Sequence, residues 1–559
     1  MPHDQDTGRP RVIIIGAGVS GMATGCYAQM SGADTVIFEK HVLPGGCCTA
    51  WARDGYILDY CIEWLIGTAA GNDANQVWRE LGALDGKTVR NFEMFNTVVD
   101  TDGRSVTFYN DPDRLERHLM ELSPVDAALI RTFCADLRRF IGINLYPFLT
   151  PPPLQTIREK VRTLMTVLPA FRLFWRTGAT QMTAFAQRFQ DPLLRRALPN
   201  IFFQDHECFP LLPYLYNMAG AYHGNAGFPQ GGSLGLARSI EERYIGLGGR
   251  IQYRSPVRRI LVQHGRAVGV ELKNGTRHHA DYVVAACDGY TTIYQMLEGR
   301  YVNRTIEKLY QDLLHRPDIL YPGVVSAFVG LRGDVGPDEP HITTHLLTDE
   351  QTAALPCATQ GSLVLQLRSR YSDGFTPPGR SLIHCTYFSD FTYWHELRVN
   401  DRQRYTAEKR RVADFVRAHL ERIYPGIGER IEVVNVSSPA TTRRYTGNHN
   451  GSILAWKSFS DAESLLTKLI GKQRMGLPGL DRFAMAGQWV GGGGLIRAAS
   501  TGRFATQYLC RDLGLPFRAW ESPGGPAWHP DRLGHLPQLD REPRPEGRPG
   551  RRSGQAVPR

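Results

Sequence analysis

The first forty residues carry the feature that most constrains the fold. Residues 12–15, after Arg11, are an apolar run, glycines follow at Gly16, Gly18 and Gly21, and a second apolar run ends in Glu39. In a βαβ unit this order permits a tight turn at Gly16, close approach of the backbone to a pyrophosphate at Gly18 and close helix packing at Gly21. Free N–H groups at the helix start face the phosphates, and a carboxylate about 20 residues further on accepts ribose hydroxyls. The chain therefore begins with a predicted dinucleotide site.

Length and composition are those of a multidomain globular protein. The 559 residues predict two or three domains, and a hydrophobic content of 42% with 21% charged residues is ordinary for such a chain. The net charge of +10 owes much to an arginine-rich tail, and no stretch alternates basic and aromatic residues as a nucleic-acid groove does. We therefore expect no nucleic-acid partner.

The cysteines and the N-terminus indicate where the protein resides. Ten cysteines without C-x-x-C or Cys/His spacing predict reduced thiols and no metal site. The N-terminus lacks the basic and apolar regions of a signal peptide, and no apolar run reaches the ~20 residues that span a bilayer. We expect a cytoplasmic protein, with association to a membrane surface left open.

Three further motifs follow the βαβ unit. Paired glycines at 45–46 precede Cys47-Cys48, residues 439–448 have the sequence Pro-Ala-Thr-Thr-Arg-Arg-Tyr-Thr-Gly-Asn, and Ala-Gly-Gln-Trp at 486–489 precedes a run of glycines. Together with the start of the chain, these motifs resemble the FAD-dependent amine oxidase superfamily. Within it they resemble the branch of phytoene desaturases, carotenoid isomerases and retinol saturases, and the Gly-Gly-Cys-Cys segment is similar to the retinol saturase version.

The resemblance covers roughly residues 10–515 and implies FAD as the cofactor. It places the contacts to FAD at Gly16, Gly18, Ser20, Gly21, Glu39, Lys40, Gly45, Gly46, Cys47, Val257, Gly487, Gly494 and Leu495. Adjacent cysteines seldom form a disulfide without strain, so Cys47 and Cys48 are expected to pack beside the cofactor.

The expected fold class is α/β, with a discontinuous Rossmann-type FAD-binding domain that includes a β-meander, and an inserted mixed α/β substrate domain. The FAD-binding domain is assigned to residues 1–75, 224–290 and 435–516, and the substrate domain to residues 76–223 and 291–434.

Strand and tail signals complete this assignment. Three apolar segments at 250–253, 257–262 and 267–272, with Gly265 and Asn274-Gly275 as turn signals, predict the β-meander. Residues 517–559 are rich in Pro, Gly and Arg and predict a disordered tail.

Two charged residues are candidates for a catalytic role. Glu63 lies in an apolar stretch expected beside the flavin, where burial would raise its pKa and suit proton transfer, although a structural carboxylate is an equal alternative. The family usually has Gly-Gly-Gly-[Leu/Ile]-Pro here, whereas residues 491–497 read Gly-Gly-Gly-Gly-Leu-Ile-Arg, without the proline and with an added Arg497. This arginine either stabilises the anionic reduced flavin or pairs with a carboxylate.

Two apolar stretches bear on the substrate. Residues 164–175 are apolar with flanking arginines and predict either a kinked core helix, the interpretation we favour, or a helix that docks on a membrane. Residues 202–209 are aromatic and include His206 and Glu207, and they are candidates for lining a substrate tunnel.

The resemblance implies an FAD-dependent oxidoreductase that desaturates a long apolar isoprenoid or polyene and then passes electrons to oxygen or a quinone. The alternatives are a retinol saturase-like reductase, a carotenoid isomerase, or a desaturase that tailors a polyketide or acyl chain. A hypothesis from another class is a non-catalytic flavoprotein or carrier of lipid-like molecules, supported only by the missing proline near Gly494.

Overall fold

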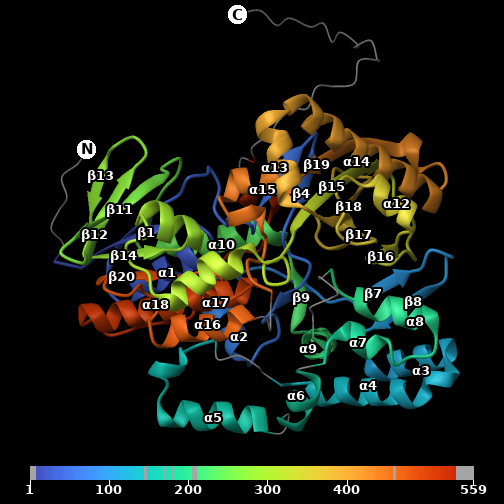
Figure 1. The fold of residues 1–559 in the computed structure, drawn as a ribbon, viewed down its shortest axis with the longest axis horizontal. Helices are drawn as coiled ribbons and strands as arrows, with labels where there is room; N and C mark the ends of the chain where they lie inside the picture. Colours follow the sequence, from blue (N-terminus) through green and yellow to red (C-terminus); the bar gives the residue numbers. More distant parts are fainter. Residues whose placement is uncertain are drawn as a thin grey trace, which may run out of the picture.

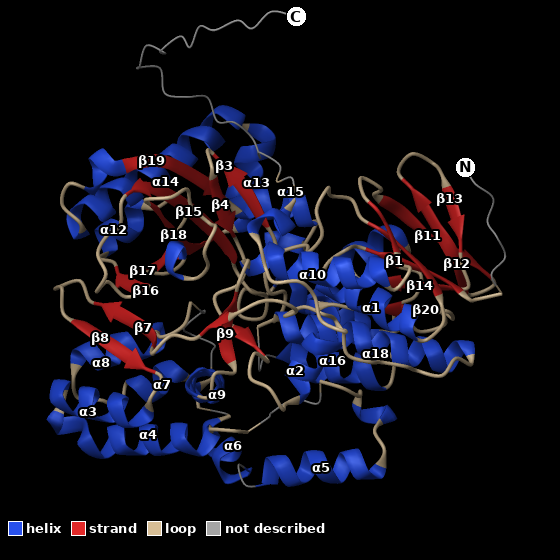
Figure 2. Cartoon of the chain, turned by 180° about the vertical axis from the view of Figure 1, so that it is seen from behind, coloured by secondary structure: helices blue, strands red, loops and turns tan. Residues whose placement is uncertain are grey.

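The computed structural model describes residues 8–143, 148–168, 171–178, 180–203, 210–457, 461–534 and 536. Its elements gather into two regions, with one sheet and its helices on each side of the molecule (Figures 1 and 2). The segments that carry the sequence motifs lie at the ends of strands of both sheets or follow them in the chain, and so border both regions.

The first region is built on a five-stranded, wholly parallel sheet in the order β10-β2-β1-β14-β20. Its strands are β1 (Arg11–Ile15), β2 (Asp34–Phe38), β10 (Arg250–Gln252), β14 (Tyr282–Ala285) and β20 (Phe483–Met485). Three segments far apart in the sequence thus supply one sheet, as expected of a discontinuous Rossmann-type domain.

Helix α1 (Val19–Met30) is buried along its whole length, between this sheet and helices α10 (Gly232–Gly246) and α18 (Leu495–Leu513). Glycines allow the close approach. A Cβ atom on Gly502 would lie 2.5 Å from the backbone oxygen of Ser20, and one on Gly25 would lie 2.5 Å from the Tyr244 ring. Both distances are shorter than a Cβ contact permits, so glycine is required at both positions.

The β-meander consists of β11 (Val257–Gln263), β12 (Arg266–Leu272) and β13 (Arg277–His279). The expectation that residues 250–253 form its first strand is wrong. Residues 250–252 form β10, which pairs in parallel with Val36–Phe38 of β2 at the edge of the main sheet. The sequence of so short a strand does not indicate which strand it pairs with. The position of residues 250–252 is therefore decided by their pairing with the distant strand β2.

The second region is built on a seven-stranded sheet in the order β19-β15-β18-β17-β16-β7-β8. Its strands are β7 (Met94–Val99), β8 (Ser105–Tyr109), β15 (Gly323–Arg332), β16 (Ile342–Leu346), β17 (Ser362–Leu367), β18 (Arg380–Ser389) and β19 (Ile431–Ser437). The expected domain boundary at residue 435 falls inside β19. Because β19 pairs with β15 through Ser437, the second region extends to that residue.

Helices cover this sheet at both ends (Figure 1). One group packs beside β7 and β8 and consists of α3 (Pro112–Leu122), α4 (Ala127–Phe140), α7 (Met182–Ala186), α8 (Pro192–Ala197) and α9 (Leu211–Tyr222). The other group consists of α12 (Asp349–Ala354), α13 (Phe391–Asn400) and α14 (Arg402–Ile423).

Further short elements are β3 (Ala50–Arg53), β4 (Tyr56–Asp59), β5 (Leu65–Ile66), α2 (Asp73–Glu80), β6 (Val89–Arg90), β9 (Ala226–Pro229), α11 (Arg304–Glu307), α15 (Pro439–Thr446), α16 (Asp461–Gly471) and α17 (Gln488–Gly491). Several of them, among them α2, α16 and α17, pack against the core of the first region. Among the described residues, no helix has both the length and the apolar character needed to cross a bilayer.

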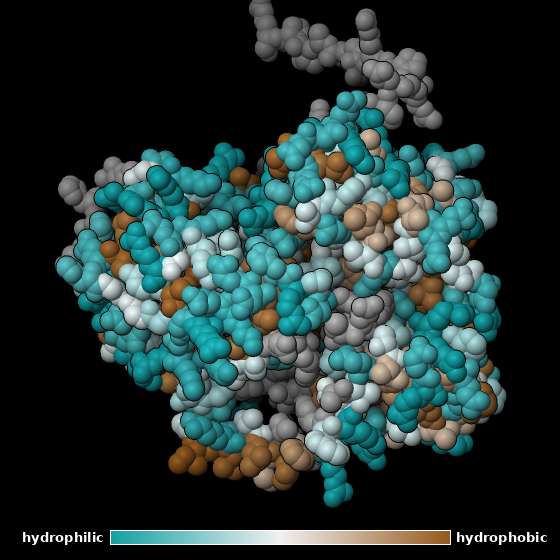
Figure 3. Space-filling model, viewed as in Figure 1, coloured by the Kyte–Doolittle hydropathy of each residue, from teal (hydrophilic) through white to brown (hydrophobic). Residues whose placement is uncertain are grey.

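The apolar stretch at 164–175 is not a core helix, contrary to the favoured expectation. It belongs to α5 (Ile157–Val167) and α6 (Phe171–Thr177), and α5 lies along one edge of the molecule (Figure 1). Leu164 is 61% exposed and Trp175 is 83% exposed. Figure 3 shows hydrophobic residues gathered along α5. Within the described part of the chain, no element covers these exposed side chains.

The expected disordered tail also differs from the structure over residues 517–534. Trp528 and Leu533 are buried, and the Trp528 ring lies against Gly231 and Gly235 at the start of α10. Arg532 pairs with Glu242. Composition predicts disorder from the scarcity of apolar residues, but here two apolar side chains hold the segment. Residues 535 and 537–559 lie outside the described residues.

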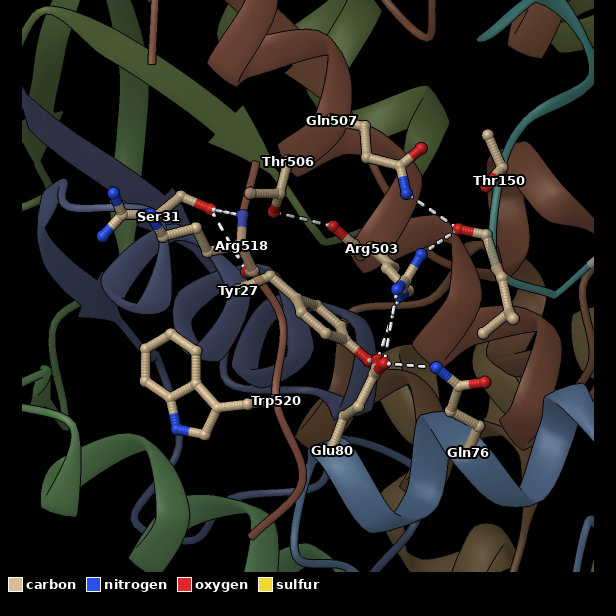
Figure 4. A network of polar contacts seen from close by, with 12 residues as sticks. Tyr27, Ser31, Gln76, Glu80, Thr150, Arg503, Thr506, Gln507, Arg518 and Trp520 are labelled. Atoms are coloured by element: carbon tan, nitrogen blue, oxygen red, sulfur yellow. Dashed lines mark hydrogen bonds and ion pairs between the residues drawn. The ribbon is translucent and has the colours of Figure 1, made fainter. Parts of the chain in front are cut away.

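A buried ion pair ties α18 to α1 and α2 (Figure 4). Arg503 Nε donates to Glu80 Oε2 at 3.0 Å, and both side chains are almost fully buried. The Tyr27 hydroxyl donates to the same carboxylate at 2.8 Å, and Gln76 Nε2 donates to its other oxygen at 3.0 Å. The protein tolerates the burial of this ion pair because both carboxylate oxygens of Glu80 are hydrogen-bonded.

We expect Glu80→Ala to destabilise the protein by about 3–5 kcal/mol, because it leaves the Arg503 guanidinium buried without its anion. The matched control is Glu521→Ala, which removes an exposed partner of Arg79 and should cost about 0.5 kcal/mol or less. Thermal unfolding followed by circular dichroism measures both. Equal shifts for the two variants would contradict the role assigned to the buried pair.

Candidate cofactor and substrate site

A cavity of about 730 Å³ opens at the carboxyl ends of β1 and β2, in the size range of cofactor sites. The four sequence motifs meet here, because residues from the glycine turn, the paired glycines, the 439–448 segment and the 486–489 segment all line its wall. The carboxyl edge of a parallel sheet is where doubly wound folds bind ligands.

The structure brings nearly all the expected cofactor residues together. Those that line this cavity are Gly16, Gly18, Ser20, Glu39, Lys40, Gly45, Gly46, Cys47, Val257, Gly487, Gly494 and Leu495. Gly21 does not line it. A Cβ atom at Gly21 would lie 2.0 Å from the Gly16 backbone oxygen, so this glycine serves the packing of α1 on the turn.

Gly18 fits a backbone that must lie close to a ligand. Its φ of −68° is open to any residue, and a Cβ atom built there meets no protein atom within 4 Å. Neither backbone strain nor packing therefore requires glycine at this position. The space that a side chain would fill is the space in front of the N-terminus of α1, where unpaired N–H groups favour an anion.

Glu39 is held in place by the backbone on both of its oxygens. Oε2 accepts from the Ala17 N–H and Oε1 from the His41 N–H, each at 2.7 Å. Burial raises the pKa of Glu39 while these hydrogen bonds oppose the shift. A carboxylate has about four lone-pair sites, so two remain to accept the hydroxyls of a ribose.

The charge along the cavity suits an anionic ligand. Basic side chains at its wall outnumber the carboxylates of Glu39 and Asp288, and they are Lys40, Arg258, Lys273, Arg398, Arg402, Lys409, Arg443 and Arg444. Burial lowers the pKa of the Lys40 ammonium group. An excess of cations at a cleft raises the local concentration of anions such as a pyrophosphate.

The paired cysteines pack beside the cavity and are free thiols. Cys48 Sγ donates to the Ser233 backbone oxygen at 3.1 Å, and Cys47 Sγ accepts from Asn448 Nδ2 at 3.3 Å. At the other end, the Gly487 N–H donates to Thr501 Oγ1 at 2.8 Å, which fixes the last glycine turn. Gly494 has a φ of +113°, a conformation that favours glycine.

A second cavity of about 280 Å³ continues from the first, since both are lined by Cys47, Tyr60, Cys61, Gly494 and Leu495. Its remaining wall is largely aromatic and aliphatic and includes Trp64, Phe148, Phe203, Leu212, Tyr321, Val324 and Trp456. The site is therefore a cofactor cavity that leads into an apolar one. Of the aromatic stretch at 202–209, residues 204–209 with His206 and Glu207 lie outside the described residues.

Both catalytic candidates line the second cavity. Glu63 Oε1 accepts from Gln366 Nε2 at 2.6 Å, and burial raises the pKa of this carboxyl although Arg368 opposes the shift. Arg497 pairs with Glu463 at 3.4 Å, which is the carboxylate pairing that formed one of the two alternatives.

The sequence offered no signal for a third charged residue, Arg368. Its guanidinium is fully buried, donates to the Ile62 backbone oxygen at 2.6 Å and lies 3.8 Å from Asp59. Burial raises the pKa of Asp59 to about 6, against the opposing effects of Arg368 and of hydrogen bonds from Ser233. Arg368 follows β17 with no motif around it, so only strand pairing places it beside Glu63.

The fold and this pair of cavities define an FAD-dependent oxidoreductase. The chain belongs to the family of flavin containing amine oxidoreductases, whose profile matches residues 19–510.

Its relatives include enzymes of polyene metabolism. The chain is 24% identical to prolycopene isomerase of Arabidopsis thaliana, over 79% of this chain and 73% of the relative. It is 23% identical to all-trans-retinol 13,14-reductase of Danio rerio, over 81% and 78%. It is 27% identical to the zeta-carotene-forming phytoene desaturase of Myxococcus xanthus, over 50% and 53%.

Solved structures share the fold. Cyclohexylamine oxidase from Brevibacterium oxydans superposes with a TM-score of 0.56 at 13% identity, covering 90% of this chain and all of the other. At this identity the likeness concerns the fold alone, and it agrees with the expected α/β class.

We expect Gly18→Val to yield a folded protein that has lost its flavin, because a Cβ atom there meets no protein atom within 4 Å and the added side chain takes up space in front of α1. Gly246→Val is the matched control, since a Cβ atom there also meets nothing within 4 Å but lies far from the cavity, at the end of α10. Visible absorbance gives the flavin content, and circular dichroism reports folding. Full flavin content in Gly18→Val would contradict the assignment of this space to the cofactor.

Proposed function

We propose that this FAD-dependent oxidoreductase acts on carbon–carbon bonds of a long apolar isoprenoid or polyene, and that it desaturates its substrate. The observation that carries the proposal is the second cavity, whose apolar, largely aromatic wall adjoins the glycine turns expected to hold the flavin. Bound FAD supplies the chemistry that the chain lacks, namely the acceptance of a hydride.

The residues of the chain bind, orient and shield the substrate. Aromatic side chains hold an extended apolar chain and exclude water from the reacting carbons. We assign to Glu63 the acceptance of the proton that leaves the neighbouring carbon. Its carboxylate lines the cavity, and its raised pKa makes it a stronger base than an exposed glutamate.

The second candidate is a reductase or isomerase of the same class of substrate. It is favoured by the relatives that match most of this chain, which are a prolycopene isomerase and a retinol reductase. The Gly-Gly-Cys-Cys segment supports the same candidate. Both reactions would use the same two cavities, so the wall of the site is equally compatible with them. Oxygen or a quinone is our proposed electron acceptor for the desaturation.

The test is anaerobic mixing of the flavin-loaded protein with extracted isoprenoids, carotenes and retinoids. A desaturase should lose its visible flavin absorbance with one class and yield a product with an added double bond. Reduction by an artificial donor, followed by reoxidation with a polyene, would instead indicate the reductase. Geometric isomers with no net change in the flavin would indicate the isomerase.

Glu63→Gln sharpens this test, because the amide keeps an oxygen for Gln366 but cannot accept the proton. We expect the rate of flavin reduction to fall by about 10²–10⁴-fold with flavin content unchanged. Glu93→Gln, which changes an exposed partner of Arg114, serves as the control and should react at the wild-type rate. A wild-type rate in Glu63→Gln would remove this residue from the mechanism.

We also propose that α5 and α6 dock on a membrane that supplies the apolar substrate. The exposed apolar residues on these helices are Ile157, Val161, Leu164, Met165, Leu168, Phe171 and Trp175, and Arg158, Lys160, Arg172 and Arg176 lie among them. Apolar side chains that enter the lipid, beside cations that meet anionic head groups, are typical of interfacial helices. Phe148, just before α5 in the chain, lines the second cavity.

We expect the double variant Leu164→Ser/Trp175→Ser to bind vesicles of phosphatidylcholine and phosphatidylserine at least about tenfold more weakly than the wild type. A serine buries less apolar area in the lipid than the leucine or tryptophan that it replaces. Co-flotation with the vesicles measures the bound fraction. The control is Val399→Ser, which removes an exposed apolar side chain on α13 and should float like the wild type. Equal flotation of all three proteins would contradict docking through α5 and α6.

A further inference from the structure

Two cysteines face each other at the open end of the β3–β4 hairpin. The first residue of β3 lies opposite the last residue of β4 in antiparallel register. One step further, the Tyr60 N–H donates to the Thr49 backbone oxygen at 3.2 Å, so the pairing continues beyond the two strands. The next step places Cys48 opposite Cys61. Because the preceding pair is hydrogen-bonded, this pair is a non-hydrogen-bonded one, in which opposite side chains lie closest.

The side chains of these two cysteines interact directly. A hydrogen bond between the thiols of Cys48 and Cys61, together with burial, raises the pKa of Cys48 well above its ordinary value. Ser233 holds both residues, since its backbone oxygen accepts from Cys48 Sγ at 3.1 Å and its hydroxyl accepts from the Cys61 N–H at 3.2 Å. Both cysteines are free thiols in the structure. Directly opposite residues of an antiparallel pair meet the geometric requirement of a disulfide.

The two thiols differ in their access to the cavities. Cys61 is half-buried and lines both cavities, whereas Cys48 is 1% exposed and lines the first. Gly494 and Leu495, which are expected to contact the flavin, lie at the same junction of the cavities. An accessible thiol with a partner thiol behind it is a usual arrangement of a reversible thiol–disulfide site.

Cys47 is another thiol at this junction. The influence of Cys61 on Cys47 is electrostatic, whereas Cys61 and Cys48 are hydrogen-bonded. The sulfur of Cys47 accepts instead from Asn448 Nδ2 at 3.3 Å. The contacts therefore favour Cys48 as the partner of Cys61, and Cys47 provides a matched control.

We propose that Cys48 and Cys61 are a reversible dithiol–disulfide centre that exchanges two electrons with the bound flavin. On oxidation, the two S–H bonds break and one S–S bond forms. The pair gives two electrons and one proton to the oxidised flavin and releases the second proton to water. The reverse transfer takes one proton from water and restores both thiols. The inference rests on the FAD site and not on the identity of the substrate.

The centre gives the enzyme a second store for an electron pair beside its cofactor. In a desaturation, the disulfide takes the electron pair from the reduced flavin before oxygen or a quinone accepts it. In a reduction, the two thiols supply an electron pair to the oxidised flavin. The centre is thus compatible with either direction of the proposed reaction.

Peptide mapping tests whether the disulfide forms. The holoenzyme is reduced with dithiothreitol, freed of it and exposed to air, so that oxygen reoxidises the flavin. Free thiols are then alkylated and the protein is digested with trypsin. Trypsin cuts after Arg53, between the two cysteines, so a disulfide joins two peptides that separate on reduction. We expect this joined peptide after exposure to air and its loss in protein kept under argon.

Serine variants identify the partners, because a hydroxyl keeps the hydrogen-bond donor of the thiol but forms no disulfide. Cys48→Ser and Cys61→Ser should lose the joined peptide. Cys47→Ser and Cys385→Ser should keep it, since Cys385 is a buried thiol on β18 that lines neither cavity. Thermal unfolding and visible absorbance check that each variant folds and carries flavin.

Photoreduction tests the exchange with the flavin, because the electrons then enter the protein through the flavin alone. The air-oxidised holoenzyme is illuminated with EDTA under argon while the flavin absorbance is followed. We expect the wild type to take up about four electrons before the flavin is fully reduced and Cys48→Ser about two, since each centre is a two-electron couple. The joined peptide of the wild type should disappear as the electrons enter.

Each outcome decides the inference. Absence of the joined peptide from the air-exposed wild type would overturn it. A joined peptide that is lost in Cys47→Ser but kept in Cys48→Ser would overturn the choice of partner. Full reduction of the flavin beside an intact disulfide would overturn the electron exchange. None of these measurements uses a substrate, so the proposed function stands or falls separately in its own assay.

Discussion

The structure depends on how closely α1 lies against its neighbours. Gly502 of α18 lets that helix meet α1, and Gly25 of α1 lets α1 meet α10, at places where no Cβ atom fits. The Arg503–Glu80 ion pair holds α18 to the same assembly. This packing sets the N-terminus of α1 at the mouth of the larger cavity. Because the last glycine turn leads directly into α18, the same contact places both glycine turns at the larger cavity.

The site joins two cavities of opposite character. Basic side chains and backbone N–H groups line the larger one, whereas aromatic and aliphatic side chains line most of the smaller one. The seven-stranded sheet provides one wall of the smaller cavity.

Sequence reasoning identified residues that meet at one cavity where each signal lies within one short segment. The glycine turn and Glu39 lie within one βαβ unit, and the motif residues at 45–47 and 487–495 reach the same cavity. Sequence reasoning failed where contacts with a distant segment of the chain decided the local structure. Residues 250–252 joined β2 instead of the meander, and the apolar stretch at 164–175 lies on the surface because no element covers it. Trp528 likewise ordered a segment whose composition predicts disorder.

The sequence by itself determined the cofactor and the fold class, because dinucleotide binding requires glycines and an acid at set spacings within a short stretch of chain. Only the tertiary structure decided the wall of the second cavity. Ser326, Thr386, His384 and Arg368 lie on different strands or follow them, and no spacing along the chain relates them. Strand register brings them to one face, and register is set by pairing between distant segments, which leaves no local pattern in the sequence.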